Sequence, residues 1–316
     1  MYRIGIDLGG TNIAVGIVND EHKIVVKKTT PTLAKRESEA IVADMARICL
    51  EACDELGVDV KDITNIGIAS PGIANPNNGC VEYANNLPFR RFPIVKILAG
   101  LLGVDEKVIK IANDANAAAW GEAVAGAAKG SANSIMVTLG TGVGGGIIID
   151  NKILTGFNSA AGEIGHIVIE QDGAPCGCGR RGCWESYSSA TALIRMTKEA
   201  IEECKKTGRY TSMSSLERIS GRSACEAMRA GDEVATEVYN KYVKYLATGI
   251  TNLVNIFQPE VISLGGGVSN EGQSLIDAIL PLVRAEQYGG DVVALTQLRI
   301  ATLGNDAGII GAAALE

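Results

Sequence analysis

The sequence predicts an α/β protein built from two related domains. Two strand, glycine-turn, strand units support this prediction: IGIDLGGTNIAVGIV at residues 4–18 and SIMVTLGTGVGGGIIID at residues 134–150. β-favouring residues flank each glycine turn, as is typical of a hairpin. A similar unit that returns far along the chain indicates a duplicated architecture. The segments between the two units alternate helical and strand patterns, which favours an α/β fold.

The remaining elements follow in order. Helical periodicity predicts a helix at 38–56, and NIGIASPG at 65–72 predicts a strand that runs into a turn. An alanine-rich helix is expected at 115–128. After the second hairpin come a cysteine-rich loop at 173–183, helices at about 187–206 and 233–257, a strand that ends at Gly265, a helix from about Gly272 and a helix in the last dozen residues.

No linker rich in Pro, Ser or charge separates the two halves, so a short hinge is expected near residue 113. We therefore predict a small N-terminal domain at 1–113 and a large domain at 114–302, with a C-terminal helix at 303–316 that packs back on the first domain.

Composition excludes some functions. The 316 residues are 47% hydrophobic and 21% charged, as in an ordinary soluble globular protein. The net charge of −7 is spread without a basic block, so we expect no nucleic-acid partner. The start MYRIGID lacks the features of a secretory signal, and no apolar run is long enough to span a bilayer. We expect a cytoplasmic protein with no membrane partner.

The first glycine turn has the form of a phosphate-binding turn. A glycine turn leaves backbone N–H groups unpaired and lets a phosphate approach without an intervening Cβ. Asp7 stands where a carboxylate could hold Mg²⁺. The alternative is an ordinary hairpin turn. The candidate residues for a phosphate and its magnesium here are Asp7, Gly9, Gly10, Thr11 and Asn12.

The second turn formally satisfies G-x-G-x-x-G, but a dinucleotide-binding fingerprint needs a helix at its last glycine. Here the chain continues as a strand, IIIDNKIL, and the P-loop pattern is absent from the sequence. A third burst of glycines follows a strand and precedes a helix, where a ribose or base could lie against bare backbone. An ordinary tight turn is the alternative. The candidate nucleotide-binding residues are Gly140, Thr141, Gly142, Val143, Gly144, Gly265, Gly266 and Gly267.

Asn113 and Asp114 precede the alanine-rich helix. Both residue types are preferred helix N-caps, which is the structural explanation for them. The functional explanation is that Asp114 accepts the proton of an attacking hydroxyl while Asn113 holds a neighbouring hydroxyl. Phosphoryl transfer needs little more from the protein than an oriented nucleophile, a base and neutralised phosphate charge.

Three cysteines crowd into eight residues close after one of the two histidines. His166, Cys176, Cys178 and Cys183 offer one imidazole and three thiolates, the complete set for a tetrahedral structural Zn²⁺ site. The alternative is a core histidine beside free thiols. A zinc ion with four protein ligands has no open position for chemistry, so we expect it to brace the loop that presents Glu163 and Glu185.

The pairing of AGEIGH with PCGCGRRGCWE resembles the signature of the ROK family almost residue for residue. DLGGT, SPG, NDAN, GTGVGGG and GGGVS extend the resemblance over essentially the whole chain. It implies a glucokinase-like sugar kinase of the actin, hexokinase and Hsp70 superfamily. That superfamily has two duplicated actin-like (ribonuclease H-like) domains with a nucleotide and sugar cleft between them. Asp114 is then the general base, and the candidate residues of the three glycine segments are those that bind ATP. The implied cofactors are ATP, Mg²⁺ and structural Zn²⁺.

The resemblance also implies the sugar-binding residues, which are Gly72, Asn86, Asn113, Asp114, Glu163, His166 and Glu185. A turn at Gly72 and a loop amide at Asn86 are the structural alternatives. Trp184 departs from many relatives, which carry an aliphatic residue there. It could reshape the edge of the pocket or simply pack.

Glucose is the expected acceptor, and N-acetylglucosamine, N-acetylmannosamine and fructose are alternatives because relatives use nearly the same residues for them. A non-catalytic sugar sensor or regulator is the rival from another class. ROK repressors carry an added N-terminal helix-turn-helix domain, for which we expect no room before the first hairpin at residue 4. Relatives are commonly dimers or tetramers, which implies a homodimer or homotetramer.

Overall fold

The computed structural model describes all 316 residues, which divide into two compact units. The first unit comprises residues 1–136, 146–162 and 301–316, and the second comprises 137–145 and 163–300. None of the helices combines the length and apolar character needed to cross a bilayer. The domain boundary near residue 113 stays a prediction.

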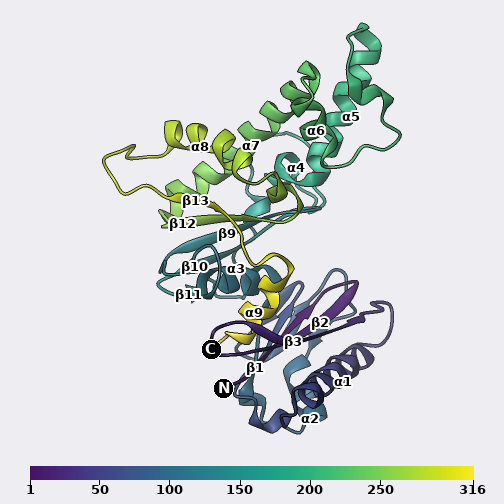
Figure 1. Cartoon of the computed structure of the whole chain (residues 1–316), viewed down its shortest axis with the longest axis vertical. Helices are drawn as coiled ribbons and strands as arrows, with labels where there is room; N and C mark the ends of the chain where they lie inside the picture. The colour runs from purple at the N-terminus through teal and green to yellow at the C-terminus, as the bar shows by residue number, and fades with distance from the viewer. The chain divides into compact units, whose positions relative to one another are not determined.

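The first unit contains a five-stranded sheet with the order β3-β2-β1-β4-β8. Its strands β1, β2 and β3 are labelled in Figure 1. Its strands are β1 Arg3–Leu8, β2 Asn12–Val18, β3 Ile24–Pro31, β4 Ile66–Ser70 and β8 Ile109–Asn113. β1 pairs antiparallel with β2, which confirms the first predicted hairpin, and parallel with β4. β8 pairs parallel with β4 and forms an edge of the sheet.

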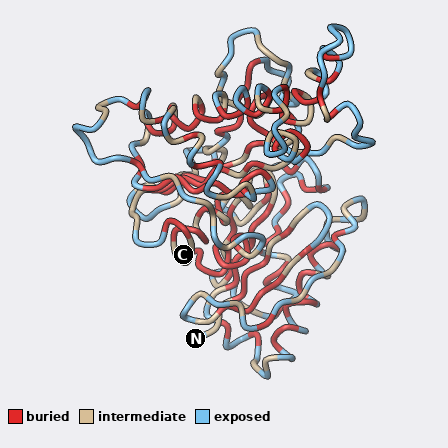
Figure 2. Tube along the Cα trace, turned by 45° about the horizontal axis from the view of Figure 1, so that its top comes forward, coloured by how far each residue is buried: buried red, intermediate tan, exposed pale blue.

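Alternation along the strands divides the two faces of this sheet. Ile4, Ile6, Ile66 and Ile68 are fully buried in one core together with residues of α1 Ser38–Leu56 and α2 Ile94–Leu102. Gly5 and Gly67 alternate with these isoleucines and face the other side of the sheet. On that side α9 Ala307–Ala313 packs on β1 and β4. A Cβ on Gly67 would lie only 1.7 Å from the Ala312 carbonyl oxygen, so only glycine permits this contact. Figure 2 shows buried segments running through the interior of the trace and exposed segments in its outer loops.

Helix α3 runs Asp114–Val124 and also packs on α9. It begins one residue earlier and ends four residues earlier than predicted, because the chain turns at Ala125, where φ and ψ leave the helical range. The unpredicted β5 Ile73–Asn75, β6 Cys80–Tyr83 and β7 Arg90–Phe92 form a small three-stranded sheet. Single 3₁₀ turns occur in this unit at Val60–Asp62, Glu106–Val108 and Gly304–Asp306.

A second five-stranded sheet has the order β11-β10-β9-β12-β13. Its strands are β9 Ser134–Leu139, β10 Val143–Ile149, β11 Lys152–Ile153, β12 Val261–Gly265 and β13 Gln297–Ile300. β9 and β10 flank the second glycine turn as predicted, and β12 ends at Gly265 as predicted.

The helices of the second unit are α4 Glu185–Ser188, α5 Ala190–Thr207, α6 Ser223–Arg229, α7 Glu233–Phe257 and α8 Gln273–Glu286. The Ser189 hydroxyl caps α5, and the Asp232 carboxylate caps α7. Short 3₁₀ turns lie at Ile164–His166, Ser212–Ser215 and Gly267–Glu271.

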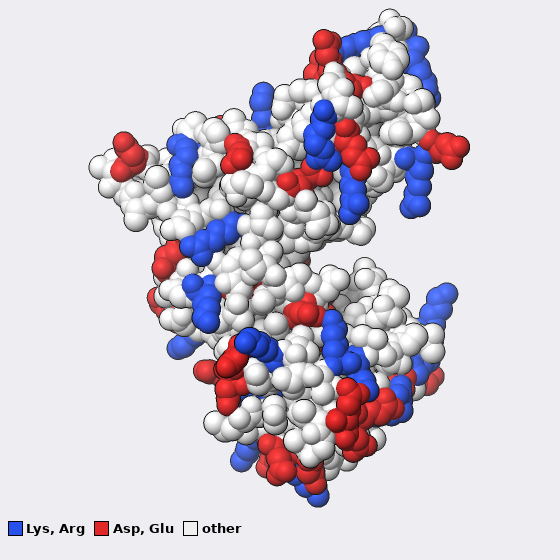
Figure 3. Space-filling model, viewed as in Figure 1, with Lys and Arg blue, Asp and Glu red and all other residues white.

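On the face drawn in Figure 3, acidic and basic side chains are interspersed.

Candidate active site

The first glycine turn offers two unpaired donors. The Gly9 N–H donates to Asn12 O at 2.9 Å and closes the turn, whereas the N–H groups of Gly10 and Thr11 donate to no protein acceptor. Gly10 and Thr11 are exposed. Adjacent, exposed and unpaired N–H groups are the feature that a bound phosphate needs.

Asp7 is the penultimate residue of β1 and lies two residues before Gly9 of this turn. Burial, together with the nearby Asp114 carboxylate, raises its pKa from the ordinary value of 3.8 to about 6, although Lys27 acts in the opposite direction. Asp7, the predicted magnesium ligand, therefore lies within range of electrostatic repulsion by Asp114, the predicted base. A divalent cation between two such carboxylates would relieve their repulsion.

Asn113 caps α3, as the structural explanation predicts, and also contacts Gly72. Its Oδ1 accepts from the N–H groups of Ala115 and Asn116 at 2.9 and 3.2 Å, which is the N-cap of α3. Its Nδ2 donates to the Gly72 carbonyl oxygen at 3.0 Å. The cap holds Asp114 in the first turn of α3, and the amide ties two predicted sugar-binding residues, Gly72 and Asn113, together.

Asn86 is exposed in the loop after β6. A Cβ on Gly10 would lie 3.6 Å from the Asn86 Cβ, so the predicted sugar residue lies beside the first glycine turn.

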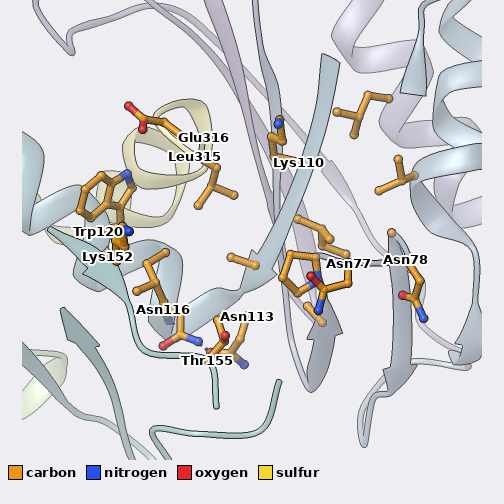
Figure 4. A pocket seen from close by; sticks show the side chains of 18 of the residues that line it. Asn77, Asn78, Lys110, Asn113, Asn116, Trp120, Lys152, Thr155, Leu315 and Glu316 are labelled. Atoms are coloured by element: carbon orange, nitrogen blue, oxygen red, sulfur yellow. Dashed lines mark hydrogen bonds between the residues drawn. The ribbon is translucent and has the colours of Figure 1, made fainter. Parts of the chain in front are cut away.

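A cavity of about 720 Å³ in the first unit is bordered by Asn113, Asn116 and Trp120 (Figure 4). It runs along β8 toward the C-terminal Glu316. Asp7, Asp114, Gly10 and Asn86 do not line it. The residues predicted to serve the phosphates and the base therefore lie outside this cavity.

The second glycine turn repeats the pattern of the first. The Gly140 N–H donates to Gly142 O at 3.0 Å, and the N–H groups of Thr141 and Gly142 donate to no protein acceptor. The Val143 N–H is engaged differently, because it donates to Oε2 of Glu185 at 3.1 Å. Gly144 follows within β10.

The third glycine segment, Gly265–Gly267, packs against the residue before the second turn. Gly266 has a φ of 84°, which favours glycine, and a Cβ there would lie 2.6 Å from the Leu139 carbonyl oxygen. Leu139 directly precedes Gly140, so two of the three predicted ATP-binding segments are neighbours within the second unit. Gly265 ends β12, and Gly267 begins the 3₁₀ turn that follows.

His166, Cys176, Cys178 and Cys183 place one ligand atom each within 4.8 Å of one another. The Cys176 Sγ lies 3.6 Å from Nδ1 of His166, and Sγ of Cys178 lies 3.7 Å from Sγ of Cys183. Backbone hydrogen bonds shape the loop, since Cys176 N–H donates to Arg180 O at 2.9 Å. One imidazole and three thiols fit Zn²⁺ in number and chemical type.

The thiols differ in acidity. A backbone hydrogen bond from Arg180 holds the pKa of exposed Cys178 below its ordinary value, while burial raises the pKa of Cys183 to about 12. Cys183 would therefore bind as a thiolate only if a metal displaces its proton, which is the usual coupling between zinc binding and proton release.

The two predicted sugar carboxylates differ in their surroundings. Glu185 is half-buried at the start of α4, and its Oε1 lies 3.5 Å from the Cys176 Sγ. Glu163 is exposed, and its carbonyl accepts from the His166 N–H at 3.1 Å. The structure therefore places Glu185 against the cysteine cluster, and it joins Glu163 to His166 through the backbone.

Two threonines that no sequence motif predicts hold the glycine turns. Thr32 donates through Oγ1 to Gly9 O at 2.6 Å, and Thr191 donates through Oγ1 to Thr141 O at 2.7 Å. Both lie far along the chain from the turns they contact and belong to no motif, so only the folded structure reveals them.

Comparison with known proteins covers the whole chain. The model of the ROK family matches residues 3–316. A glucokinase of Streptomyces coelicolor is 37% identical over 99% of this chain and 96% of its own. A ROK family glucokinase from Streptomyces griseus, solved with glucose and AMPPNP, is 35% identical with a TM-score of 0.77, over 99% of this chain and 98% of that one.

A ROK hexokinase from Thermus thermophilus is 32% identical with a TM-score of 0.81, over 99% of this chain and 97% of that one. These full-length likenesses confirm the predicted α/β fold of actin-like type. The chain belongs to the ROK family.

Proposed function

We propose that this protein is an ATP-dependent hexose kinase that phosphorylates glucose to glucose 6-phosphate. The observation that carries the kinase proposal is the pair of glycine turns, each with two adjacent N–H groups that lack a protein acceptor. Glucose as the acceptor is supported by the glucokinase relatives and by the glucose complex of the Streptomyces griseus enzyme.

Asp114 acts as the general base in this proposal. It takes the proton of the sugar hydroxyl as the oxygen attacks the γ-phosphorus of ATP, and the phosphoryl group leaves ADP for that oxygen. Asn113 and Gly72, which are hydrogen-bonded to each other, orient neighbouring hydroxyls together with Asn86. Glu163 and Glu185 accept hydrogen bonds from the remaining hydroxyls, and His166 donates one to a hydroxyl.

The glycine turns bind the nucleotide phosphates in this proposal. The unpaired N–H groups donate to phosphate oxygens and stabilise the charge that moves during transfer. Asp7 would hold Mg²⁺, which supplies positive charge to the phosphates. Gly265–Gly267 would lie near the adenosine.

His166, Cys176, Cys178 and Cys183 would hold a structural Zn²⁺ that fixes the loop carrying His166 and Glu185. Nδ1 of His166 faces the thiols, which leaves Nε2 for a sugar hydroxyl. A cytoplasmic location and a homodimer or homotetramer stay predictions.

A coupled assay of ADP release tests the proposal. The purified protein is given Mg·ATP and a panel of glucose, fructose, N-acetylglucosamine and N-acetylmannosamine, with Asp114→Ala as the control. We expect turnover that favours glucose and falls ~100- to 10,000-fold in the variant, while the variant still binds sugar. Sugar binding without turnover across the panel would instead favour a sensor or regulator, and turnover that favours another sugar would reassign the substrate.

A further inference from the structure

The two glycine turns are held from outside in the same way. In the first, Thr32 engages two carbonyls: its Oγ1 donates to Gly9 O at 2.6 Å, and its N–H donates to Thr11 O at 2.8 Å. In the second, the Thr191 Oγ1 donates to Thr141 O at 2.7 Å, and the Ala190 N–H donates to Gly140 O at 2.8 Å. Each turn thus has two anchored carbonyls, one of them bonded to a threonine hydroxyl.

An anchored carbonyl fixes the direction of an N–H group. The peptide unit is planar and all peptide bonds here are trans, so the C=O of one residue and the N–H of the next point in opposite directions. The Thr32 hydroxyl therefore sets the direction of the Gly10 N–H through the Gly9 carbonyl. In the same way, Thr191 sets the direction of the Gly142 N–H through the Thr141 carbonyl.

These two N–H groups are among those that find no protein acceptor. They are directed away from the threonines, toward whatever ligand the turns bind. In each case the residue after the anchored carbonyl is a glycine, which tolerates a wide range of φ. Without the hydroxyl, that peptide unit can turn over at little cost and present a carbonyl oxygen to the ligand.

We propose that Thr32 and Thr191 are positioning residues that orient the two glycine turns for nucleotide phosphates. This inference rests on the proposed kinase function. A carbonyl oxygen turned toward a phosphate would repel it, so each hydroxyl strengthens nucleotide binding without touching the nucleotide.

Thr191 allows the cleaner test because it is exposed, whereas Thr32 is fully buried. Thr191→Val keeps the side-chain shape and removes the hydroxyl, and Thr191→Ser retains the hydroxyl. Thr207 provides a matched control: it lies on the same helix α5, is exposed, and donates through Oγ1 to Glu203 O at 2.9 Å. Thr207→Val removes an equivalent hydrogen bond far from the turn.

Binding of AMPPNP with Mg²⁺ is measured by isothermal titration calorimetry for the parent and the three variants, and KM for ATP and for glucose is measured alongside. We expect Thr191→Val to raise the dissociation constant for AMPPNP and KM for ATP by about 3- to 10-fold, the effect of one hydrogen bond. KM for glucose and the melting temperature should stay unchanged, and Thr191→Ser and Thr207→Val should match the parent. The two Thr32 variants are compared with the parent at equal concentrations of folded protein. Thr32→Val should weaken AMPPNP binding and raise KM for ATP, and Thr32→Ser should bind AMPPNP like the parent.

The possible failures are distinguishable. If the parent binds no AMPPNP, the proposed function falls and this inference falls with it. If the parent binds AMPPNP but Thr191→Val binds it equally well, the positioning role is refuted while the kinase proposal stands. Equal weakening by Thr207→Val, or a Thr191→Ser variant as weak as Thr191→Val, would also refute it, since the effect would then reflect the helix and not the hydroxyl.

Discussion

The indole ring of Trp184 lies directly against Gly249 of α7, where a Cβ would come within 1.9 Å of Cε2 of the ring. Trp184 is fully buried, and its Nε1 donates to Tyr245 O at 3.0 Å. These contacts show that the ring packs against α7, which is one of the two roles that the sequence leaves open for Trp184. Glu185 follows directly in the chain, so the anchored ring also fixes the start of α4.

Gly249→Ala should therefore destabilise the protein by about 1–3 kcal/mol, the usual range for overpacking a tight contact. Elsewhere in a helix the same change is stabilising. Gly100→Ala is the matched control, because Gly100 lies within α2 with no atom within 4 Å of the added Cβ. Urea unfolding of both variants measures the difference, and a Gly249→Ala variant as stable as Gly100→Ala would contradict the packing.

Local patterns account for the parts of the fold that the sequence predicts. The hairpins at β1–β2 and β9–β10 follow from alternating β-branched residues around glycines, and α1 runs over the predicted residues 38–56. The elements that escaped prediction have weaker signals. β3 ends in the polar run KKTTP, and β8 is only five residues long. The strand conformation of β3 depends on antiparallel pairing with the preceding strand β2, and that of β8 on parallel pairing with β4, from which α2 separates it in the chain.

Within the candidate site, too, local patterns predict some residues and not others. The cysteine cluster is predictable because its four ligands lie in 18 consecutive residues of known spacing. The link between Glu185 and Val143, and the anchors at Thr32 and Thr191, join segments about 20 to 50 residues apart. No local pattern encodes such contacts, because they depend on how strands and helices pack.

Cys178→Ser should lower the zinc content of the purified protein. The serine hydroxyl is a much poorer zinc ligand than a thiolate, so the cluster would lose one of its four donors. Cys80→Ser is the control, because Cys80 lies in β6, outside the cluster. Metal analysis should give about one zinc per chain for the parent and the control and clearly less for Cys178→Ser, with a lower melting temperature. Full zinc occupancy in that variant would exclude Cys178 as a ligand.

Glu122→Ala should destabilise the first unit strongly. The Glu122 carboxylate is fully buried and accepts from the N–H groups of Ala127, Thr302 and Leu303 at 2.6, 2.9 and 2.8 Å. Its removal takes the carboxylate acceptor away from three backbone N–H groups, at about 1–3 kcal/mol each. We expect a loss of at least about 3 kcal/mol in urea unfolding. Glu226→Ala, at an exposed position of α6, should change stability by less than about 0.5 kcal/mol. A loss of stability in Glu122→Ala as small as that in Glu226→Ala would show that the buried hydrogen bonds of Glu122 contribute little.

Asp7→Asn should stabilise the protein relative to the parent as the pH rises. Because burial and Asp114 raise the Asp7 pKa from 3.8 to about 6, the folded state holds this proton more tightly than the unfolded state. Stability of the parent therefore falls between about pH 4 and pH 6, by up to about 3 kcal/mol for a shift of about two pKa units. Asparagine carries no charge at any of these pH values, so the variant escapes that loss.

Urea unfolding from pH 4 to pH 8 without Mg²⁺ measures the difference in stability between Asp7→Asn and the parent. This difference should grow in favour of Asp7→Asn up to about pH 6 and stay constant above it. Gly100→Ala, which changes no titratable group, should differ from the parent by the same amount at every pH. A pH-independent difference for Asp7→Asn would mean that the Asp7 carboxyl is as easily ionised in the folded protein as in the unfolded chain.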